Sequence, residues 1–130
     1  METAMSRARL KETAEKLVAL CREGRDTEAL NTLYERHAAS IEAVGMPGMS
    51  AEIVGVEAIK DKHDWFSSAH EMHGVTVDGP YLHRDDRFGV IFEMDVTNKH
   101  TGERKQAREI AIYHVDEDGR IVREEFFYNS

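Results

Sequence analysis

Apolar residues recur at helical spacing in the first third of the chain. They follow an i, i+4, i+7, i+8, i+11 pattern between charged side chains, which predicts an amphipathic helix over about residues 6–23. These positions are Leu10, Ala14, Leu17, Val18 and Cys21. Gly24 follows where a helix C-cap tolerates positive φ. Asp26 or Thr27 is a suitable N-cap for a second, shorter helix that ends near Leu33 and Tyr34.

A second helical stripe lies in the middle of the chain. Val56, Ile59, His63 and Phe66 share one face of a helix predicted over 56–69, and Trp65 lies beside that face. Short strands are predicted before this helix, over about 37–44 and 51–55. The segment 45–48 separates them, because its glycines and proline break regular structure.

From about His73 the apolar period shortens from 3.6 toward 2, which indicates strands. Polar turns divide this part into predicted strands over about 75–83, 87–97, 104–115 and 121–128, the first with a bulge at Gly79-Pro80. On 87–97 one face carries the apolar residues Phe88, Val90, Phe92, Met94 and Val96. Helices followed by antiparallel strands make an α+β fold, and residues 1–130 are expected to form one domain.

The last two predicted strands carry apolar residues on both faces. On 104–115 we assign Ala107, Glu109, Ala111, Tyr113 and Val115 to the inner face, leaving Arg108, Ile110, Ile112 and His114 outside. On 121–128 the inner set is Val122, Glu124, Phe126 and Tyr128, and the outer set is Ile121, Arg123, Glu125 and Phe127. An outer face that is not simply polar favours a homodimer in which two sheets pack together.

Composition and net charge limit the classes of partner and cofactor that the chain is expected to bind. The chain of 130 residues has 17 basic and 25 acidic residues, a net charge of −8, which argues against nucleic acid and anionic membranes. No apolar run approaches the ~20 residues of a membrane helix, and residues 1–7 lack the apolar core of a signal peptide, so a cytoplasmic protein is expected. The lone Cys21 excludes a multi-cysteine zinc site, and His70 and His73 lack a nearby third ligand. We therefore expect no metal and no other cofactor.

Four segments together carry a family resemblance. They are residues 17–24, Leu33-Tyr34 followed by an extended 38–43, 55–59 at the start of the third helix, and 118–128 at the end of the chain. In their order and spacing the sequence resembles the nuclear transport factor 2-like superfamily, in its SnoaL-like branch, from about Leu10 to Tyr128. The resemblance implies a cone: a strongly curved antiparallel sheet with three N-terminal helices packed over its concave face, cystatin-like or ketosteroid-isomerase-like.

Members of this superfamily bind small apolar molecules inside the cone, and many dimerise through the outer sheet face. Some are isomerases, cyclases, dehydratases or hydrolases, and others have no activity, so the fold alone does not name the reaction. In the ketosteroid isomerase pattern, the general-base aspartate corresponds to Glu42 here. The two oxyanion-hole donors of that pattern fall on Leu17 and Ala111, which have no polar group to donate. That steroid isomerase mechanism is therefore not expected.

Further polar residues are expected to face the interior. Glu42, His63 and Glu109 form the predicted acid–base set. His63 is alternatively a hydrogen-bonded core or rim residue, and Glu109 and Glu124 alternatively pair with Arg104, Arg108 or Arg123 at the sheet rim. The expected ligand-binding residues are Leu17, Tyr34, Trp65, Phe66, Phe88, Phe92, Ala111, Glu124 and Phe126. Aromatic residues at such positions alternatively form plain core.

The function predicted from these features is binding of a small, apolar, polyketide- or steroid-like ligand. Cofactor-free acid–base catalysis of isomerase, cyclase or hydratase type would accompany it, with Glu42 as base and His63 or Glu109 orienting or protonating. A carrier without turnover is the first alternative. The second is an association module that binds another protein through its sheet face.

Overall fold

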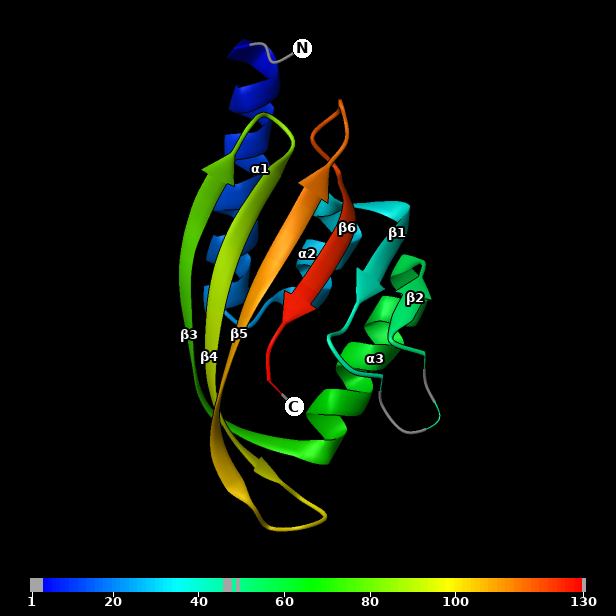
Figure 1. The fold of residues 1–130 in the computed structure, drawn as a ribbon, viewed down its shortest axis with the longest axis vertical. Coiled ribbons are helices and arrows are strands. Elements are labelled where there is room, and N and C mark those ends of the chain that lie inside the picture. Colours follow the sequence, from blue (N-terminus) through cyan, green and yellow to red (C-terminus); the bar gives the residue numbers. More distant parts are fainter. Residues whose placement is uncertain (1–3, 46–47, 49, 130) are drawn as a thin grey trace.

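The computed structural model describes residues 4–45, 48 and 50–129. In this part of the chain helices alternate with strands before a final run of strands (Figure 1). The helices are α1 (Ala4–Arg22), α2 (Asp26–Leu33) and α3 (Val56–Ala69). The strands are β1 (Tyr34–Ile41), β2 (Glu52–Val54), β3 (His70–His83), β4 (Arg87–Asn98), β5 (Arg104–Val115) and β6 (Ile121–Phe127).

The six strands form one open sheet in the order β2-β1-β6-β5-β4-β3. Its neighbours pair antiparallel except β1 and β6, which are parallel. The sheet curves, and all three helices lie on one side of it, with α1 behind β3 and β4 and with α3 near β1 and β2 (Figure 1). The predicted α+β fold with three helices over a curved sheet is confirmed.

The core lies between the helices and the concave face of the sheet. The predicted stripe of α1 is buried there, with Leu10 and Ala14 at 0% and Leu17 at 1% exposure. Phe88 and Val90 of β4 meet it from the sheet. The inner face predicted for β5 is also correct, because Ala111, Tyr113 and Val115 are buried while Ile110 is 45% exposed. This burial of apolar area supplies the main stabilisation of the fold.

Three boundaries differ from the sequence prediction: those of β1, of α2, and of β3, which begins at His70 and not near Val75. Strand β1 begins at Tyr34, directly after α2, because Tyr34 pairs with Ile121 of β6; the strand ends at Ile41, so Glu42 lies just beyond it. Helix α2 has no side-chain N-cap: Arg25 holds that position and Asp26 is already helical. Asp26 and Glu28 instead place negative charge in the first turn, where the helix dipole favours it.

The inner and outer faces predicted for β6 hold for part of the strand only. His114 pairs with Arg123 and Val115 with Ile121, so one residue bulges out of register between them. This bulge turns Ile121 inward, where it is 0% exposed, although strict alternation assigned it to the outer face. Glu124 remains on the inner face and is 1% exposed. The bulge thus places an apolar anchor and a carboxylate on one face of a short strand.

Candidate functional site

A chain of hydrogen bonds crosses the interior from α3 to the sheet. The Lys62 Nζ donates to Ser40 Oγ at 2.7 Å, and Ser40 Oγ donates to Glu124 Oε2 at 2.6 Å. The Tyr34 hydroxyl donates to the other carboxylate oxygen, Glu124 Oε1. All four residues are buried, with Ser40 at 0% and Lys62 at 6% exposure. A buried carboxylate needs such donors, because without them the loss of hydration would be prohibitive.

Local structure explains why these side chains meet. Ser40 and Glu124 are register partners in the parallel β1–β6 pair, and Glu124 is also paired with Tyr113 of β5. Lys62 lies three residues after the fully buried Ile59, so helical periodicity turns it toward the sheet. The aliphatic part of the Lys62 side chain lies on the apolar side of α3. The Lys62 ammonium group lies 5.2 Å from the centroid of the Phe126 ring.

Glu42 lies beside this network. Its Oε2 is 3.7 Å from Lys62 Nζ, and the two side chains are 15% and 7% exposed. That oxygen is buried and has no hydrogen-bond partner. Burial raises the pKa of Glu42 above its ordinary value, and the nearby Lys62 charge opposes the rise. The carboxylate is therefore desolvated and close to a cation, yet retains free hydrogen-bonding capacity.

Glu109, on the inner face of β5, completes a group of three carboxylates around Lys62. Burial is the main cause that raises its pKa from 4.5 to about 7, and the like charges of Glu42 and Glu124 add to the rise. A carboxyl group with that pKa is present in both protonation states near neutral pH, as a general acid or base requires. The charges of Glu42 and Lys62 both act on Glu109, so the predicted pair of carboxylates shares one electrostatic site.

His63, the third predicted acid–base residue, follows Lys62 on α3. Its Nδ1 is buried without a hydrogen-bond partner. Burial raises the pKa of both Asp26 and Glu42, and a positive charge on the nearby His63 opposes that rise. The alternative of a fully hydrogen-bonded core histidine does not hold for this nitrogen. An unpaired ring nitrogen beside two carboxyl groups can accept or donate a proton to an added molecule.

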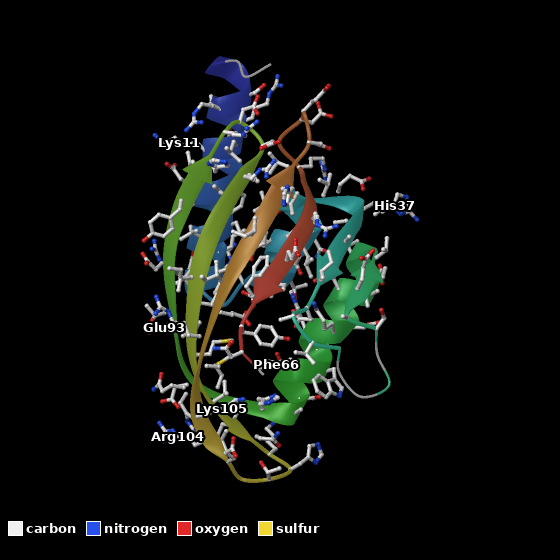
Figure 2. All side chains as sticks on the ribbon, in the orientation of Figure 1. Lys11, His37, Phe66, Glu93, Arg104 and Lys105 are labelled. Atoms are coloured by element: carbon white, nitrogen blue, oxygen red, sulfur yellow. The ribbon has the colours of Figure 1, made fainter. Side chains whose placement is uncertain are left out.

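The predicted ligand-binding residues fall into four groups. Leu17, Phe88 and Ala111 belong to the closed core, and Phe88 stacks on Tyr113 with ring centroids 4.9 Å apart. Tyr34, Glu124 and Phe126 belong to the polar network or contact it. Phe66 and Phe92 are half-buried. The Phe66 side chain stacks on His70 and extends from α3 on the side of the helix that faces the sheet (Figure 2). Trp65 lies apart from the network, 45% exposed, with its ring edge-on to His70.

The arginines considered as partners for Glu109 and Glu124 make other ion pairs. Arg104 pairs with Asp95 at 2.8 Å, Arg108 with Glu93 at 3.4 Å and Arg123 with Glu125 at 3.5 Å. Arg104 lies near the β4–β5 turn, and Glu93 lies farther from that turn along β4 (Figure 2). The two inner glutamates are thus left without arginine partners, and the alternative of rim salt bridges is wrong.

His70 and His73 do not share a helical turn, because β3 already begins at His70. Their ring nitrogens lie 3.1 Å from the Phe66 carbonyl and 2.7 Å from Thr97 Oγ1, respectively. Across the described residues, no group of three or more His, Cys, Asp and Glu has an arrangement that could hold a metal ion. Within the same part of the chain, no helix is both long enough and apolar enough to cross a bilayer.

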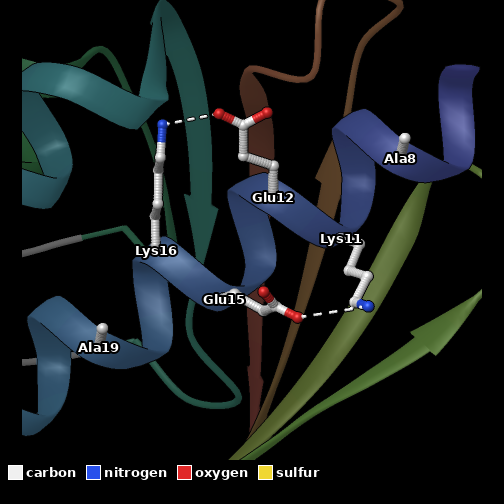
Figure 3. A pocket seen from close by; sticks show the side chains of 6 residues that line it. All are labelled: Ala8, Lys11, Glu12, Glu15, Lys16 and Ala19. Carbon is white, nitrogen blue, oxygen red and sulfur yellow. Dashed lines mark hydrogen bonds and ion pairs between the residues drawn. The ribbon is translucent and has the colours of Figure 1, made fainter.

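Hollows on the outside of the described part of the chain include the following two. One, of about 490 Å³, runs along the solvent-facing side of α1 between Ala8 and Ala19 and is bordered by the ion pairs Lys11–Glu15 and Lys16–Glu12 (Figure 3). The other, of about 360 Å³, lies on the convex side of the sheet, where Tyr81, Ile91, Ile110 and Ile112 contribute to its walls. Neither hollow is lined by Glu42, Lys62 or Glu124.

Sequence reasoning missed Lys62 and Ser40 as members of the site. A signal for Lys62 was present, since its spacing of three from Ile59 and four from Phe66 places it on the same helical face. Lysine side chains are usually solvated, so the residue type itself gave no indication of burial. Ser40 carried no signal of this kind, because its role depends on a strand pairing with residues more than 80 positions away.

Comparison with known families and structures identifies similar proteins. A family model described as "SnoaL-like domain" matches residues 9–128. The fold is similar to a crystal structure from Mesorhizobium loti described as a candidate SnoaL-like polyketide cyclase, with a TM-score of 0.84 and 36% sequence identity. The match covers 91% of this chain and 97% of that one. A search of the curated proteins found no match.

Two further structures share the fold at lower identity and contain bound molecules. TerC, crystallised with polyporic acid, is 18% identical with a TM-score of 0.72, over 93% of this chain and 92% of that one. Rv0760c from Mycobacterium tuberculosis, in complex with estradiol-17β-hemisuccinate, is 19% identical with a TM-score of 0.67, over 89% and 91% of the two chains. At these identities the likeness establishes the fold and leaves the ligand of this chain open.

Proposed function

Because the chain belongs to the SnoaL-like domain family, we propose that it binds a small apolar organic molecule, polyketide- or steroid-like, between α3 and the concave sheet. We further propose that it acts on this molecule by cofactor-free acid–base chemistry of the isomerase, cyclase or hydratase type. The bound polyporic acid and steroid ester of its structural relatives support the ligand class.

The observation that carries this proposal is the pair of unpartnered buried polar atoms, Glu42 Oε2 and His63 Nδ1. Buried polar groups in proteins are nearly always hydrogen-bonded, and exceptions occur at sites that bind or transform another molecule. Glu42 acts electrostatically on Glu109, and the Phe126 ring lies near the Lys62 ammonium group. Glu109 and Phe126 have intermediate exposure, and Phe126 packs against the closed core. A ligand that enters there would meet apolar walls and a few convergent polar groups.

In the proposed chemistry, Glu42 is the general base. Its desolvated carboxylate, with a raised pKa, removes a proton from a carbon next to a carbonyl group. Glu109, with a pKa of about 7, returns a proton at a second position. His63 orients the ligand through its free ring nitrogen. No redox step or group transfer is involved, so no cofactor is required.

Hydrogen exchange into 2-tetralone, an apolar bicyclic ketone with acidic α-hydrogens, tests this function without knowledge of the natural substrate. In D₂O the protein should accelerate deuterium incorporation at the carbon next to the carbonyl. Mass spectrometry measures this incorporation over time. Glu42→Gln should slow exchange by about 10²–10⁴-fold, the usual contribution of a general base. The affinity for the ketone should stay within about tenfold, or ~1.4 kcal/mol.

Glu93→Gln is the matched control, because Glu93 is a half-exposed glutamate that contacts Arg108 on the other side of the sheet. This variant should exchange at the parent rate. If the parent chain binds 2-tetralone without accelerating exchange, the catalytic part of the proposal is wrong. An equal loss of binding and exchange in Glu42→Gln would mean that the carboxylate only recognises the ligand.

A carrier without turnover is the second candidate function. It is favoured by Leu17 and Ala111, which lie in the closed core at 1% and 0% exposure, where the isomerase pattern has oxyanion donors. A carrier would bind apolar ketones and phenols with similar affinity in the parent and in Glu42→Gln. The exchange experiment separates the two candidates, because only the enzyme labels the bound ketone.

We also propose that two copies associate through the convex face of the sheet. Tyr81 of β3, Ile110 of β5 and Phe127 of β6 are 54%, 45% and 48% exposed, which is unusual for large apolar side chains on one face of a sheet. The convex hollow gives this face a shape into which side chains of a second copy would fit. A two-fold interface needs only one such self-complementary patch.

A further inference from the structure

We propose that Lys62 supplies the electrophile that the isomerase-like pattern lacks. Its ammonium group would bind the carbonyl oxygen of the ligand and stabilise the negative charge that develops there when Glu42 removes the neighbouring proton. The inference rests on the proposed function and assigns a new catalytic residue to it. It also defines the substrate class as a small apolar compound with an enolisable carbonyl group.

The hydrogen bonds of Lys62 leave it able to make this contact. An ammonium group has three N–H donors. Ser40 Oγ accepts one at 2.7 Å, and the Phe126 ring lies 5.2 Å from Nζ without accepting a hydrogen bond. Glu42 Oε2, at 3.7 Å, is too far for a hydrogen bond. The cation thus retains donor capacity on the side where the free carboxylate oxygen lies.

The spacing between Lys62 and Glu42 fits a carbonyl oxygen and the hydrogen on its α-carbon. A buried ion pair compensates the desolvation of its charges best at hydrogen-bond distance. Here the gap of 3.7 Å leaves both Glu42 Oε2 and an N–H of Lys62 open at once. A carbonyl oxygen bound to the ammonium would place the α-hydrogen next to the carboxylate, so that both groups act on one enolisable unit.

The proton and electron balance of the step is simple. Glu42 takes the α-proton, the C–H electron pair forms the carbon–carbon double bond, and the carbonyl π electrons move to oxygen. The negative charge passes from Glu42 to the enolate oxygen, so the net charge facing Lys62 does not change. A fixed ammonium group therefore compensates the charge before and after the transfer, and its own protons stay in place. When Glu42 itself gives the proton back to carbon, neutral product and ionised Glu42 are restored. When Glu109 instead protonates a second position, Glu42 releases its proton and Glu109 takes one up through solvent before the next cycle.

The position of the cation also matches the fold. Tyr34 and Ser40 already donate to Glu124, so the carboxylate at the base of the network has two donors without a direct contact from Lys62. Ser40 accepts from Lys62 and thereby fixes the direction of its ammonium group. The aliphatic stem is held by packing, with the whole residue 6% exposed. Such preorganisation is what an oxyanion-stabilising group requires.

The test uses 2-naphthol, the aromatic counterpart of the 2-tetralone enol, whose phenolate resembles the enolate. It is bound to Glu42→Gln, in which the neutral amide resembles Glu42 after it has taken the proton. Absorbance of the naphtholate reports the ionisation of the bound probe during a pH titration. Adding Lys62→Met to Glu42→Gln should lower the naphtholate-to-naphthol ratio at a given pH at least tenfold, a shift of about one pKa unit.

Two further variants serve as controls for this test. Lys62→Gln keeps an N–H donor for Ser40 but removes the charge, so it should show the same loss if Lys62→Met does not fold. Lys60→Met, also in the Glu42→Gln background, removes an exposed lysine of the same helix that pairs with Asp64 at 2.9 Å, and it should leave the probe's ionisation unchanged. Circular dichroism confirms the fold of each variant.

The outcomes separate the inference from the function on which it rests. Equal ionisation of bound 2-naphthol with and without the Lys62 charge would overturn the role of Lys62 and leave the acid–base proposal standing. Failure of both 2-tetralone and 2-naphthol to bind the parent chain or Glu42→Gln would overturn the proposed apolar ligand site, and the assignment of Lys62 with it. A tenfold loss confined to the Lys62 variants supports both.

Discussion

The two faces of the sheet reverse the usual distribution of polarity. On the concave side, Ser40 and Glu124 are almost fully buried, at 0% and 1% exposure. On the convex side, Tyr81, Ile110 and Phe127 are about half exposed to solvent. Burial of a polar group on the inner face costs free energy unless the group is hydrogen-bonded. On the outer face, the apolar side chains remain in contact with water. In the functions proposed above, the unpartnered Glu42 Oε2 and His63 Nδ1 of the inner face bind a small molecule, and the exposed apolar residues of the outer face bind a second copy.

Helix α3 repeats this contrast within three residues. Lys60 forms an i, i+4 pair with Asp64 at 2.9 Å, and the two side chains are 46% and 59% exposed. Lys62 faces Glu42 at 3.7 Å with side chains 7% and 15% exposed. Water screens the first pair, so it contributes little to stability. The second pair lies in a low-dielectric environment, where loss of either partner leaves an uncompensated charge.

Removal of the Lys62 charge should have the largest effect on stability. Lys62→Met leaves Glu42 without its nearest cation and Ser40 without its donor, and should lower the free energy of unfolding by about 3–5 kcal/mol. Lys60→Met should leave the urea unfolding midpoint essentially unchanged. Parallel urea titrations of both variants and the parent chain measure the difference. Similar midpoints for the two variants would contradict the distinction between the inner and outer faces of α3.

The pH dependence of stability should report Glu109. Its pKa is raised on folding, from 4.5 to about 7, so between these values the unfolded chain ionises while the folded chain keeps the proton. Stability should therefore fall as pH rises from about 4.5 to 7, by roughly 3 kcal/mol from this group. Glu109→Gln should remove that share of the slope, whereas Glu93→Gln should retain it. Urea unfolding at a series of pH values and constant salt tests this. Identical slopes for the parent chain and Glu109→Gln would show that folding does not raise the pKa of Glu109.

The convex face should give the smallest change, and one that affects association rather than folding. Ile110→Glu places a charge in the apolar patch of each copy and should weaken self-association at least tenfold, or ~1.4 kcal/mol. Val54→Glu is the control, because Val54 is 57% exposed on the edge strand β2. Sedimentation velocity over a concentration series measures both. A parent chain that stays monomeric throughout the series would refute the proposed sheet-to-sheet dimer.

Much of the fold follows from periodicity. The stripe of Leu10, Ala14 and Leu17 and the inner face of β4 are recognisable because burial repeats with the period of the element. The boundaries of β1 and the inward turn of Ile121 were not predictable in this way. Both depend on pairing: Tyr34 extends β1 because Ile121 lies beside it, and a bulge against β5 shifts the alternation of β6.

The candidate site was predictable in part. Glu42, His63 and Glu109 were expected on the inner surface, and the structure brings them into one electrostatic group around Lys62. Trp65 was expected at the ligand and is instead half-exposed beside His70. The helical pattern could not separate it from Phe66, because adjacent residues differ by only 100° around the helix.

The sequence by itself determined the element types, the α+β class, the family resemblance and the inward face of the central strands. These features depend on the order of apolar and polar residues along the chain, which local geometry converts directly into faces. The tertiary structure alone decided that Lys62, Ser40, Glu124 and Tyr34 form one network. These contacts join residues 22 to 90 positions apart, and the charge of a lysine or glutamate does not reveal whether packing will exclude water from it.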